Sequence, residues 1–391
     1  MELLLDRPRA GLTSRIFNRI EDIPREVWNG VFPDVLESYS FLKSLDESGF
    51  KQFSFRYVLV YEGDAAIAAA PCFVMDYPLD TTVRGWTRAL MLGIKKVFPG
   101  AFHLKALICG LPVDQGRIGI KNGNPRAALS EILACMEKIA GENRIGILAF
   151  KDFGCEYMEL LDPIQTRGFY KIQDMPSTEM NLDFATFEEY LKTLSRVSRD
   201  GLKRKLKKID QGPKIDLEIM NRLPPDMLAE AYALYRQTVA QSDDQFEVAP
   251  VEFFSRVTEN MPEETRFFLW KLEGRMVAFA YCLVSGEHFI DFYLGFDYAV
   301  AHAYHLYFVR FRDLMNWCLK HKIKKYEMGP TGYEAKRRLG FRMLPLYIYA
   351  KHRNRWIDPF FKLLCRSLKP ENHQQIFKDM REENTPCQKK D

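Results

Sequence analysis

Hydrophobic and polar positions in the second half of the chain alternate in a way that predicts strands followed by a helix. Three stretches rich in aromatic and aliphatic residues, 266–272, 276–285 and 288–296, are separated by tight turns that each contain Gly and Glu. This pattern is typical of an antiparallel meander. In residues 303–321, apolar side chains then recur every three or four positions, which predicts a long amphipathic helix.

The first half repeats this order. Stretches 55–61 and 65–75 form a predicted hairpin around Glu62-Gly63, and an amphipathic helix at 125–140 and a buried strand at 145–150 come later. Two copies of one arrangement indicate an internal repeat. A length of 391 residues also favours two domains. We expect domains at 1–178 and 179–370, followed by a flexible polar tail at 371–391.

A short helix is predicted directly after the strand 325–328. Gly329-Pro330 ends that strand. Thr331 and Glu334 have the spacing of a capping box, in which each side chain satisfies a backbone amide at the helix start. Gly340 is placed to end the helix in a left-handed turn. A side chain on so short and well-capped a helix would be held in position.

One face of this short helix presents Tyr333, Lys336 and Leu339, because residues three apart are neighbours on a helix. Lys336 is therefore a candidate for a positioned cation that stabilises a developing negative charge. The alternative is an ordinary solvated lysine.

The stretch 326–341 resembles the end of the second domain of FemABX-like and BioF2-like (peptidoglycan-biosynthesis-type) transferases, which are built from GNAT acetyltransferase folds. The resemblance implies an α+β fold with two GNAT-like domains in tandem, their mixed sheets flanked by helices. It implies a place for Lys336 near the acyl-transfer centre, and Tyr333 beside it is a candidate for substrate binding.

Two polar residues on the predicted strand 288–296 are further catalytic candidates. Strand alternation puts Asp291 and Tyr293 on one face with Phe289. Asp291 is a candidate general base for an amine nucleophile, and Tyr293 could orient the carbonyl or return a proton. A hydrogen-bonded pair within the sheet is the alternative.

The segment before the long helix lacks the usual acetyltransferase loop, Arg/Gln-x-x-Gly-x-Gly/Ala, in which glycines let the backbone approach a diphosphate. His305, at the end of this segment, could be catalytic or bind phosphate. A structural or solvated histidine is the alternative. The missing loop argues against ordinary acetyl-CoA binding. In the resembling family, the donor can be an aminoacyl-tRNA or an unusual acyl thioester.

Residues 196–208 predict a strongly basic helix with seven basic residues and one acid, Asp200. Arg199 and Lys203 are the substrate-binding candidates, since such a face could meet phosphates of a nucleotide, a tRNA or an anionic membrane. A solvated face is the alternative.

Segments 87–97 and 351–369 mix bulky apolar and basic residues. Both fit helices that lie on a membrane surface, and both fit helices packed on a domain.

Eight scattered cysteines show no zinc-site spacing, so we expect no metal and a reducing cytoplasm. No apolar run is long enough to cross a membrane, and no signal peptide is predicted.

These patterns and the resemblance predict a transferase that moves an acyl or aminoacyl group from acyl-CoA, a carrier thioester or aminoacyl-tRNA onto an amine of a small molecule or cell-envelope acceptor. We expect no tightly bound cofactor, and a cytoplasmic protein that could also contact the membrane peripherally. Two alternatives remain: an inactive GNAT-fold protein that binds a nucleotide-linked or lipid partner, and a membrane-surface scaffold.

Overall fold

The computed structural model describes residues 11–32, 36–78, 103–121, 123–241, 247–330 and 332–367. Contacts divide the chain into two compact units. Unit 1 takes its described residues from Met1–Asp46, Phe50–Pro176 and Leu344–Asp391, and unit 2 takes them from Glu47–Gly49 and Ser177–Met343. Residues 344–367, expected in the second domain, group with unit 1. The predicted tail at 371–391 lies outside the described residues.

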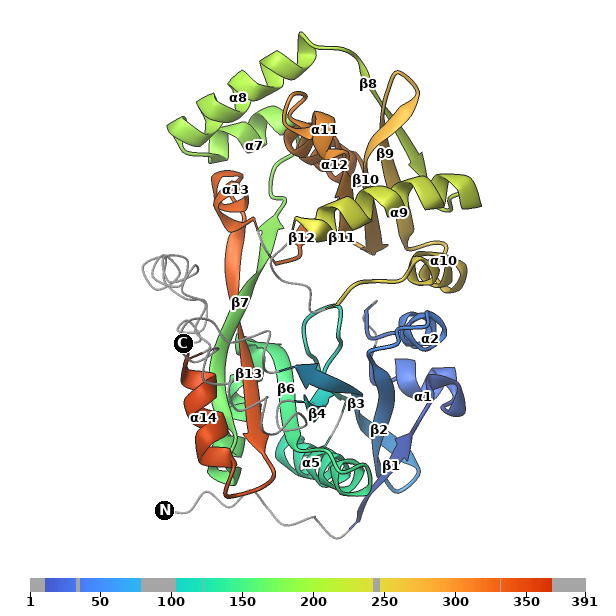
Figure 1. Cartoon of the computed structure of the whole chain (residues 1–391), viewed down its shortest axis with the longest axis vertical. Helices are drawn as coiled ribbons and strands as arrows, with labels where there is room; N and C mark the ends of the chain where they lie inside the picture. Colours follow the sequence, from blue (N-terminus) through green and yellow to red (C-terminus); the bar gives the residue numbers. More distant parts are fainter. Residues whose placement is uncertain are drawn as a thin grey trace. The chain divides into compact units, whose positions relative to one another are not determined.

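Unit 1 contains a mixed sheet with the strand order β1-β2-β3-β4-β6-β13 (Figure 1). Its strands are β1 (Leu12–Phe17), β2 (Ser54–Glu62), β3 (Ala65–Pro78), β4 (His103–Cys109), β6 (Ile147–Gly154) and β13 (Arg342–His352), with β5 (Gly119–Ile120) paired to β3. Neighbouring strands from β1 to β4 are antiparallel, and β4 and β6 are parallel. The predicted hairpin around Glu62-Gly63 is confirmed, and Gly63 adopts the positive φ of 59° that the turn requires.

One long helix, α5 (Pro125–Glu142), supplies much of the apolar core of unit 1. The Asn124 side chain caps the first turn by accepting hydrogen bonds from two backbone amides. Pro125 is the first helical residue, a position where its lack of an N–H costs no intrahelical hydrogen bond. The shorter helices of this unit are η1 (Ile20–Asp22), α1 (Arg25–Asn29), α2 (Tyr39–Glu47), η2 (Cys155–Tyr157), α6 (Met158–Leu161), η3 (Asp162–Arg167) and α14 (Asp358–Ser367).

In unit 2 the sheet strands have the order β7-β12-β11-β10-β9-β8. The strands are β7 (Tyr170–Asn181, which begins in unit 1), β8 (Ile215–Met220), β9 (Thr265–Leu272), β10 (Arg275–Ser285), β11 (His288–Phe296) and β12 (Lys325–Met328). The antiparallel meander β9-β10-β11 is confirmed, and β11 pairs in parallel with β12.

Helices pack on both faces of these strands (Figure 1). They are α7 (Phe187–Thr193), α8 (Arg196–Asp210), α9 (Pro225–Ala240), α10 (Val251–Asn260), α11 (Tyr298–Ala301), α12 (Leu306–Lys320) and α13 (Tyr333–Arg338). The apolar face predicted for 303–321 is confirmed in α12, which buries Leu306, Phe311 and Leu314 against the sheet. Helix α9 contacts β10 and β11, and α10 packs aromatic side chains against Tyr293 of β11.

Candidate active site

The candidate site begins where two parallel strands of unit 2 part. Strands β11 and β12 pair over only four positions, from His288 opposite Lys325 to Asp291 opposite Met328. Beyond that pair β12 ends, whereas β11 continues to Phe296 alongside β10. Asp291 therefore occupies the last paired position before the strands separate.

Asp291 lies in a buried polar cluster beneath α12. Its Oδ2 atom accepts from Arg310 Nη1 at 2.5 Å and from the Tyr326 hydroxyl at 3.0 Å. The ion pair is almost fully buried, with 0% of the Arg310 side chain and 1% of the Asp291 side chain exposed. A buried ion pair must offset a large desolvation cost through close contact and further hydrogen bonds.

Several polar atoms in this cluster are left without a hydrogen-bond partner in the described part of the chain. They are Asp291 Oδ1, Arg310 Nε and Nη2, and the Tyr307 hydroxyl. Burial alone lowers the pKa of Arg310, but the charge of Asp291 and the nearby Tyr326 and Tyr307 raise it overall, so Arg310 stays cationic. Buried polar groups normally have partners, so this cluster has unused capacity to bind a polar ligand or water.

The short helix α13 is present, but its N-terminal cap differs from the prediction. Thr331 lies outside the described residues, and the N-cap position is Gly332, in the left-handed region with no side-chain cap. Glu334 pairs with Arg338 at 2.8 Å. The predicted capping box is therefore wrong, because a left-handed glycine begins the helix. The predicted left-handed end at Gly340 is confirmed, with φ of 85°.

Lys336 is buried, with 5% of its surface exposed, so the interpretation as a solvated helix lysine is wrong. Tyr333 and Leu339, predicted to share its face, are also buried. The Lys336 ammonium donates a hydrogen bond to the carbonyl oxygen of Gly329, the residue after β12. Burial lowers the pKa of Lys336 to about 7, with Asp291 raising it and Arg310 lowering it further. Both protonation states are therefore populated near neutral pH, and Lys336 belongs electrostatically to the Asp291–Arg310 cluster.

Tyr293 is separated from this cluster by a β-bulge. In the β10–β11 register, Tyr281 pairs with Tyr293 and Cys282 pairs with Asp291, which leaves Phe292 as the extra residue. The bulge reverses the alternation, so Tyr293 packs against α9 and α10, with its ring centroid 5.5 Å from that of Tyr235. The expectation that Asp291 and Tyr293 share a face is therefore wrong, and their catalytic roles stay predictions.

A basic region lies where α8 meets the start of α12. His305 is the N-cap residue of α12, with a left-handed φ of 51°. Burial lowers the pKa of His305, and Lys208 and Lys205 lower it further. Burial also lowers the pKa of Lys205, as does Arg338 of α13. Cationic groups of α8 and α13 therefore gather near the His305 imidazole, which favours an anionic ligand.

The two substrate-binding candidates on α8 differ in exposure. Lys203 is exposed, Arg199 is half-buried, and no acidic partner is found for either among the described residues. On its other side, this helix packs Leu202 and Leu206 into the core of unit 2.

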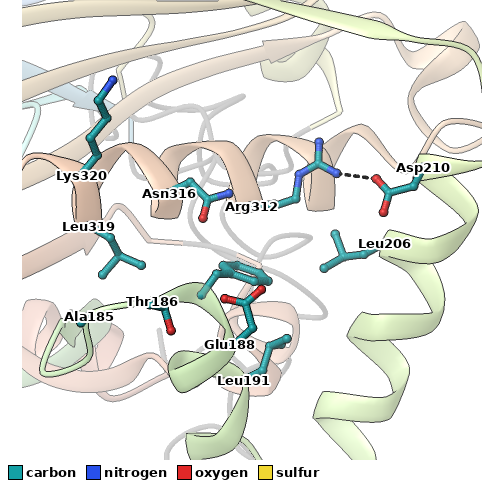
Figure 2. A pocket seen from close by; sticks show the side chains of 11 residues that line it. Ala185, Thr186, Glu188, Leu191, Leu206, Asp210, Arg312, Asn316, Leu319 and Lys320 are labelled. Atoms are coloured by element: carbon teal, nitrogen blue, oxygen red, sulfur yellow. Dashed lines mark hydrogen bonds and ion pairs between the residues drawn. The ribbon is translucent and has the colours of Figure 1, made fainter.

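A separate cavity of about 520 Å³ lies among α7, α8 and α12 (Figure 2). Its lining includes Glu188, Asn316 and Lys320, and Arg312 spans it to bond Asp210 at 3.0 Å. None of the predicted site residues lines it.

Of the two predicted membrane-surface segments, 87–97 lies outside the described residues. The other contains α14, with Trp356 and Phe360 exposed. Where the chain is described, no helix combines the length and apolar character needed to span a bilayer.

Sequence reasoning missed Arg310, Tyr326 and Tyr307. Arg310 did carry a signal: it lies three residues after Tyr307 and four before Leu314, on the apolar face of α12. A charged side chain on a buried helix face needs an oppositely charged partner. The carboxylate of Asp291 on the predicted strand 288–296 was a candidate for that partner.

Comparison with known proteins identifies the family. Residues 19–388 match the FemAB-like family, described as peptidoglycan biosynthesis/recognition. The chain belongs to this family. It has the tandem GNAT fold, as the sequence predicted.

Solved structures agree with the tandem fold. FemX is similar over 90% of this chain and 100% of its own, at 12% identity and a TM-score of 0.58. A tandem GNAT protein from the clavulanic acid biosynthesis pathway is similar over 87% of this chain and 98% of its own, at 9% identity and a TM-score of 0.52. L-PGS from Bacillus licheniformis covers 83% of this chain and 95% of its own, at 12% identity and a TM-score of 0.51.

A curated relative is much longer than this chain. A Mycobacterium tuberculosis protein, named provisionally as 8-amino-7-oxononanoate synthase 2, is 25% identical over 324 residues. The match covers 80% of this chain, which spans 42% of the length of that relative. This match is the support for the BioF2-like resemblance.

Proposed function

We propose that the protein transfers an aminoacyl group from an aminoacyl-tRNA to a primary amine on a cell-envelope precursor. The observation that carries the proposal is the buried Lys336, held at the end of β12 with a pKa of about 7 beside Asp291 and Arg310. A cation fixed where two strands part can act on a carbonyl group that enters between them.

In this reaction the acceptor amine attacks the ester carbonyl carbon, and a new carbon–nitrogen bond forms. The carbonyl oxygen becomes an oxyanion, which the protonated Lys336 stabilises by donating a hydrogen bond. The intermediate then collapses, the bond to the tRNA ribose oxygen breaks, and the proton lost by the amine ends on that oxygen. The enzyme forms no covalent intermediate.

Asp291 has two roles in this proposal. Its Oδ2 atom holds Arg310 and Tyr326 in place, which fixes the electrostatic field around Lys336. Its Oδ1 atom, which has no partner among the described residues, is the atom that could receive the proton of the amine.

The basic helix α8 supports a tRNA donor over a coenzyme thioester. Its 15 residues extend about 22 Å, which is far longer than one diphosphate. Lys203, Arg204 and Lys207 are exposed along it and have no acidic partner in the part of the chain that the structure describes. Such a surface fits a chain of phosphates.

The family description supports the proposed acceptor. The family description, peptidoglycan biosynthesis/recognition, supports an amine-bearing envelope precursor. The localisation at the cytoplasmic side of the membrane, where such precursors are made, is part of the same proposal.

The test supplies the full-length protein with tRNA charged with labelled amino acids and with a peptidoglycan precursor that carries a free amine. We expect label to move to the precursor, and Lys336→Met to slow that transfer. Acyl-CoA with the same acceptor is the parallel reaction. Transfer from acyl-CoA alone would show that the donor is wrong while the acyltransferase chemistry stands. Absence of transfer from either donor, with retained tRNA binding, would favour the inactive binding protein.

A further inference from the structure

One surface of unit 1 combines exposed apolar side chains with a basic cavity. The apolar part lies on α14 and the turn before it, where Trp356 is 70% exposed, Phe360 73% and Leu363 64%. Phe360 and Leu363 are three residues apart and therefore lie on one face of α14, and Trp356 lies in the turn just before the helix. The opposite face of α14 is packed, since Phe361 and Cys365 are buried.

Local hydrogen bonds hold this apolar face in place. The Asn354 side chain accepts a hydrogen bond from the Trp356 backbone amide at 2.9 Å. The Asn354 backbone carbonyl oxygen accepts from the Ile357 and Asp358 backbone amides at 3.0 Å. Asp358 in turn accepts from the His352 amide at 2.9 Å and pairs with Lys362 at 2.7 Å. The exposed rings are thus presented by a fixed turn and helix.

Beside this face is a cavity of about 650 Å³ that is rich in cationic side chains. Its lining includes five basic residues, Arg144, Arg167, Lys351, Arg353 and Arg355, and two acidic residues, Glu137 and Asp358.

Both acidic groups in the cavity are already occupied. Glu137 accepts from Lys351 at 2.6 Å and from Arg353 at 2.9 Å, and Asp358 makes the bonds given above. Among the described residues, Arg144, Arg167 and Arg355 have no acidic partner. The cavity therefore carries an uncompensated positive charge that suits a phosphate group.

Arg355 joins the two parts of the surface. It lines the cavity, and its guanidinium carbon lies 4.7 Å from the centroid of the Trp356 ring. Aromatic rings next to cationic groups match the boundary between lipid tails and anionic headgroups.

We infer that this surface docks the protein on an anionic lipid bilayer. The exposed face of Trp356, Phe360 and Leu363 enters the headgroup region, and a lipid phosphate occupies the arginine-lined cavity. Charge complementarity selects this occupant, because a second copy of the chain would bring the same positive charge. The inference stands apart from the proposed acyl transfer, and its test needs no catalysis.

The experiment measures co-sedimentation of the full-length protein with vesicles. We expect binding to mixed phosphatidylcholine and phosphatidylglycerol vesicles and much weaker binding to phosphatidylcholine alone. Trp356→Ala/Phe360→Ala should reduce the binding about tenfold or more. Leu217→Ala/Ile219→Ala, which changes two partly exposed apolar residues of β8, is the matched control and should bind normally.

A charge reversal tests the cavity. Arg355→Glu should weaken binding about five- to tenfold or more, and the effect should diminish as salt rises. The control is Arg126→Glu, which makes the same change in net charge. Arg126 is exposed at the N-terminal end of α5, and the residue of α5 that lines the cavity, Glu137, lies near the other end. Inorganic phosphate, compared with chloride at equal ionic strength, should compete only weakly because it gives no apolar contact.

Three results would overturn the inference. One is equal binding of wild type and Trp356→Ala/Phe360→Ala to anionic vesicles. Another is equal loss from Arg355→Glu and Arg126→Glu, which would mean that net charge alone drives the binding. The third is no vesicle binding together with a wild-type dimer that the apolar double variant abolishes, which would make a second copy the occupant.

Discussion

The two units have the same strand plan but different chemistry at equivalent positions. In unit 1, β4 and β6 pair in parallel over four positions, from Ala106 opposite Ile147 to Cys109 opposite Phe150. In unit 2, β11 and β12 also pair over four positions, and the last pair is Asp291 opposite Met328. The residue paired with this last position on the neighbouring antiparallel strand is a cysteine in both, Cys72 in unit 1 and Cys282 in unit 2. Cys109 and Asp291 are therefore structural counterparts.

What surrounds these counterparts differs. Cys109 is fully buried among apolar side chains, and burial raises the pKa of its thiol. After β4, the chain of unit 1 runs beside β6, and Gly116 bridges to Phe153. A Cβ atom on Gly116 would lie 2.1 Å from the Lys151 carbonyl oxygen, so only glycine fits there. In unit 2, the same position carries a buried ion pair with Lys336 nearby.

The difference shows that unit 1 uses the position for packing whereas unit 2 retains a costly polar cluster. A buried ion pair is often no more stabilising than apolar residues of similar volume. The apolar arrangement in unit 1 shows that this strand plan does not need the charges. We therefore assign the chemistry to unit 2.

The largest expected effect comes from giving unit 2 the residue of unit 1. Asp291→Cys leaves the Arg310 charge buried without a carboxylate, and should lower the free energy of unfolding by about 3–5 kcal/mol. Asp291→Cys/Arg310→Met removes both charges and should recover most of that stability. Urea unfolding measures both.

The control for this pair is Glu218→Cys, which breaks the more exposed ion pair with Lys271 and should cost less than about 1 kcal/mol. A single Asp291→Cys variant as stable as wild type would show that the buried pair is not what distinguishes the units.

The second expected effect is on catalysis. Lys336→Met keeps the aliphatic stem but removes the ammonium, and should slow aminoacyl transfer by roughly 10²–10³. Lys336→Arg should restore only part of the rate, since a planar guanidinium does not replace a compact ammonium. Lys325→Met, which alters a half-exposed lysine of β12 paired with Glu179, is the control. Normal turnover of a folded Lys336→Met variant would end the catalytic interpretation, and an unfolded one would make the lysine structural.

The third prediction concerns pH. Lys336 has a folded pKa of about 7, below its ordinary value of 10.5. Between these values the unfolded chain binds a proton that the folded chain does not, so stability should rise with pH in this window. Below about pH 7 both states are protonated and the full cost of the buried charge is present. The free energy of unfolding should rise by roughly 3 kcal/mol between about pH 7 and pH 9.5.

Lys336→Met should lack this rise, and comparing the two proteins by urea unfolding isolates the contribution of the lysine. Parallel pH dependence in wild type and Lys336→Met would show that Lys336 has an ordinary pKa in the folded protein.

The smallest expected effect is on donor binding by α8. Lys203→Glu/Lys207→Glu reverses two exposed charges, whereas Lys205 is left unchanged because its ammonium lies 3.7 Å from the Phe308 ring centroid. Binding of tRNA should weaken, and the slope of log affinity against log salt should fall by roughly 0.7–0.9 for each phosphate that the variant no longer neutralises. Lys51→Glu/Lys138→Glu makes the same charge change in unit 1. If both double variants weakened tRNA binding equally, α8 would not be a specific binding surface, and its basic residues would form an ordinary solvated face.

The sequence by itself determined the central strands and the long helix of unit 2 and their order. Period-two alternation specified the meander β9-β10-β11, a 3.6-residue period specified α12, and Glu-Gly pairs specified the hairpin turns. These features depend on residues close together in the chain, and local physics decides them. The resemblance in the stretch around Lys336 also located the family correctly.

The tertiary structure alone decided how the site is assembled. The bulge at Phe292 puts Tyr293 and Asp291 on opposite faces of the sheet. No local sequence pattern predicts this bulge, because the position of the extra residue depends on how β11 pairs with β10. The burial of Lys336 and the Asp291–Arg310 pair depend on residues between 19 and 45 positions apart in the chain. Desolvation depends on what packs around a group in three dimensions. For that reason the sequence left a solvated Lys336 open as an alternative, and only the tertiary structure showed that Lys336 is buried.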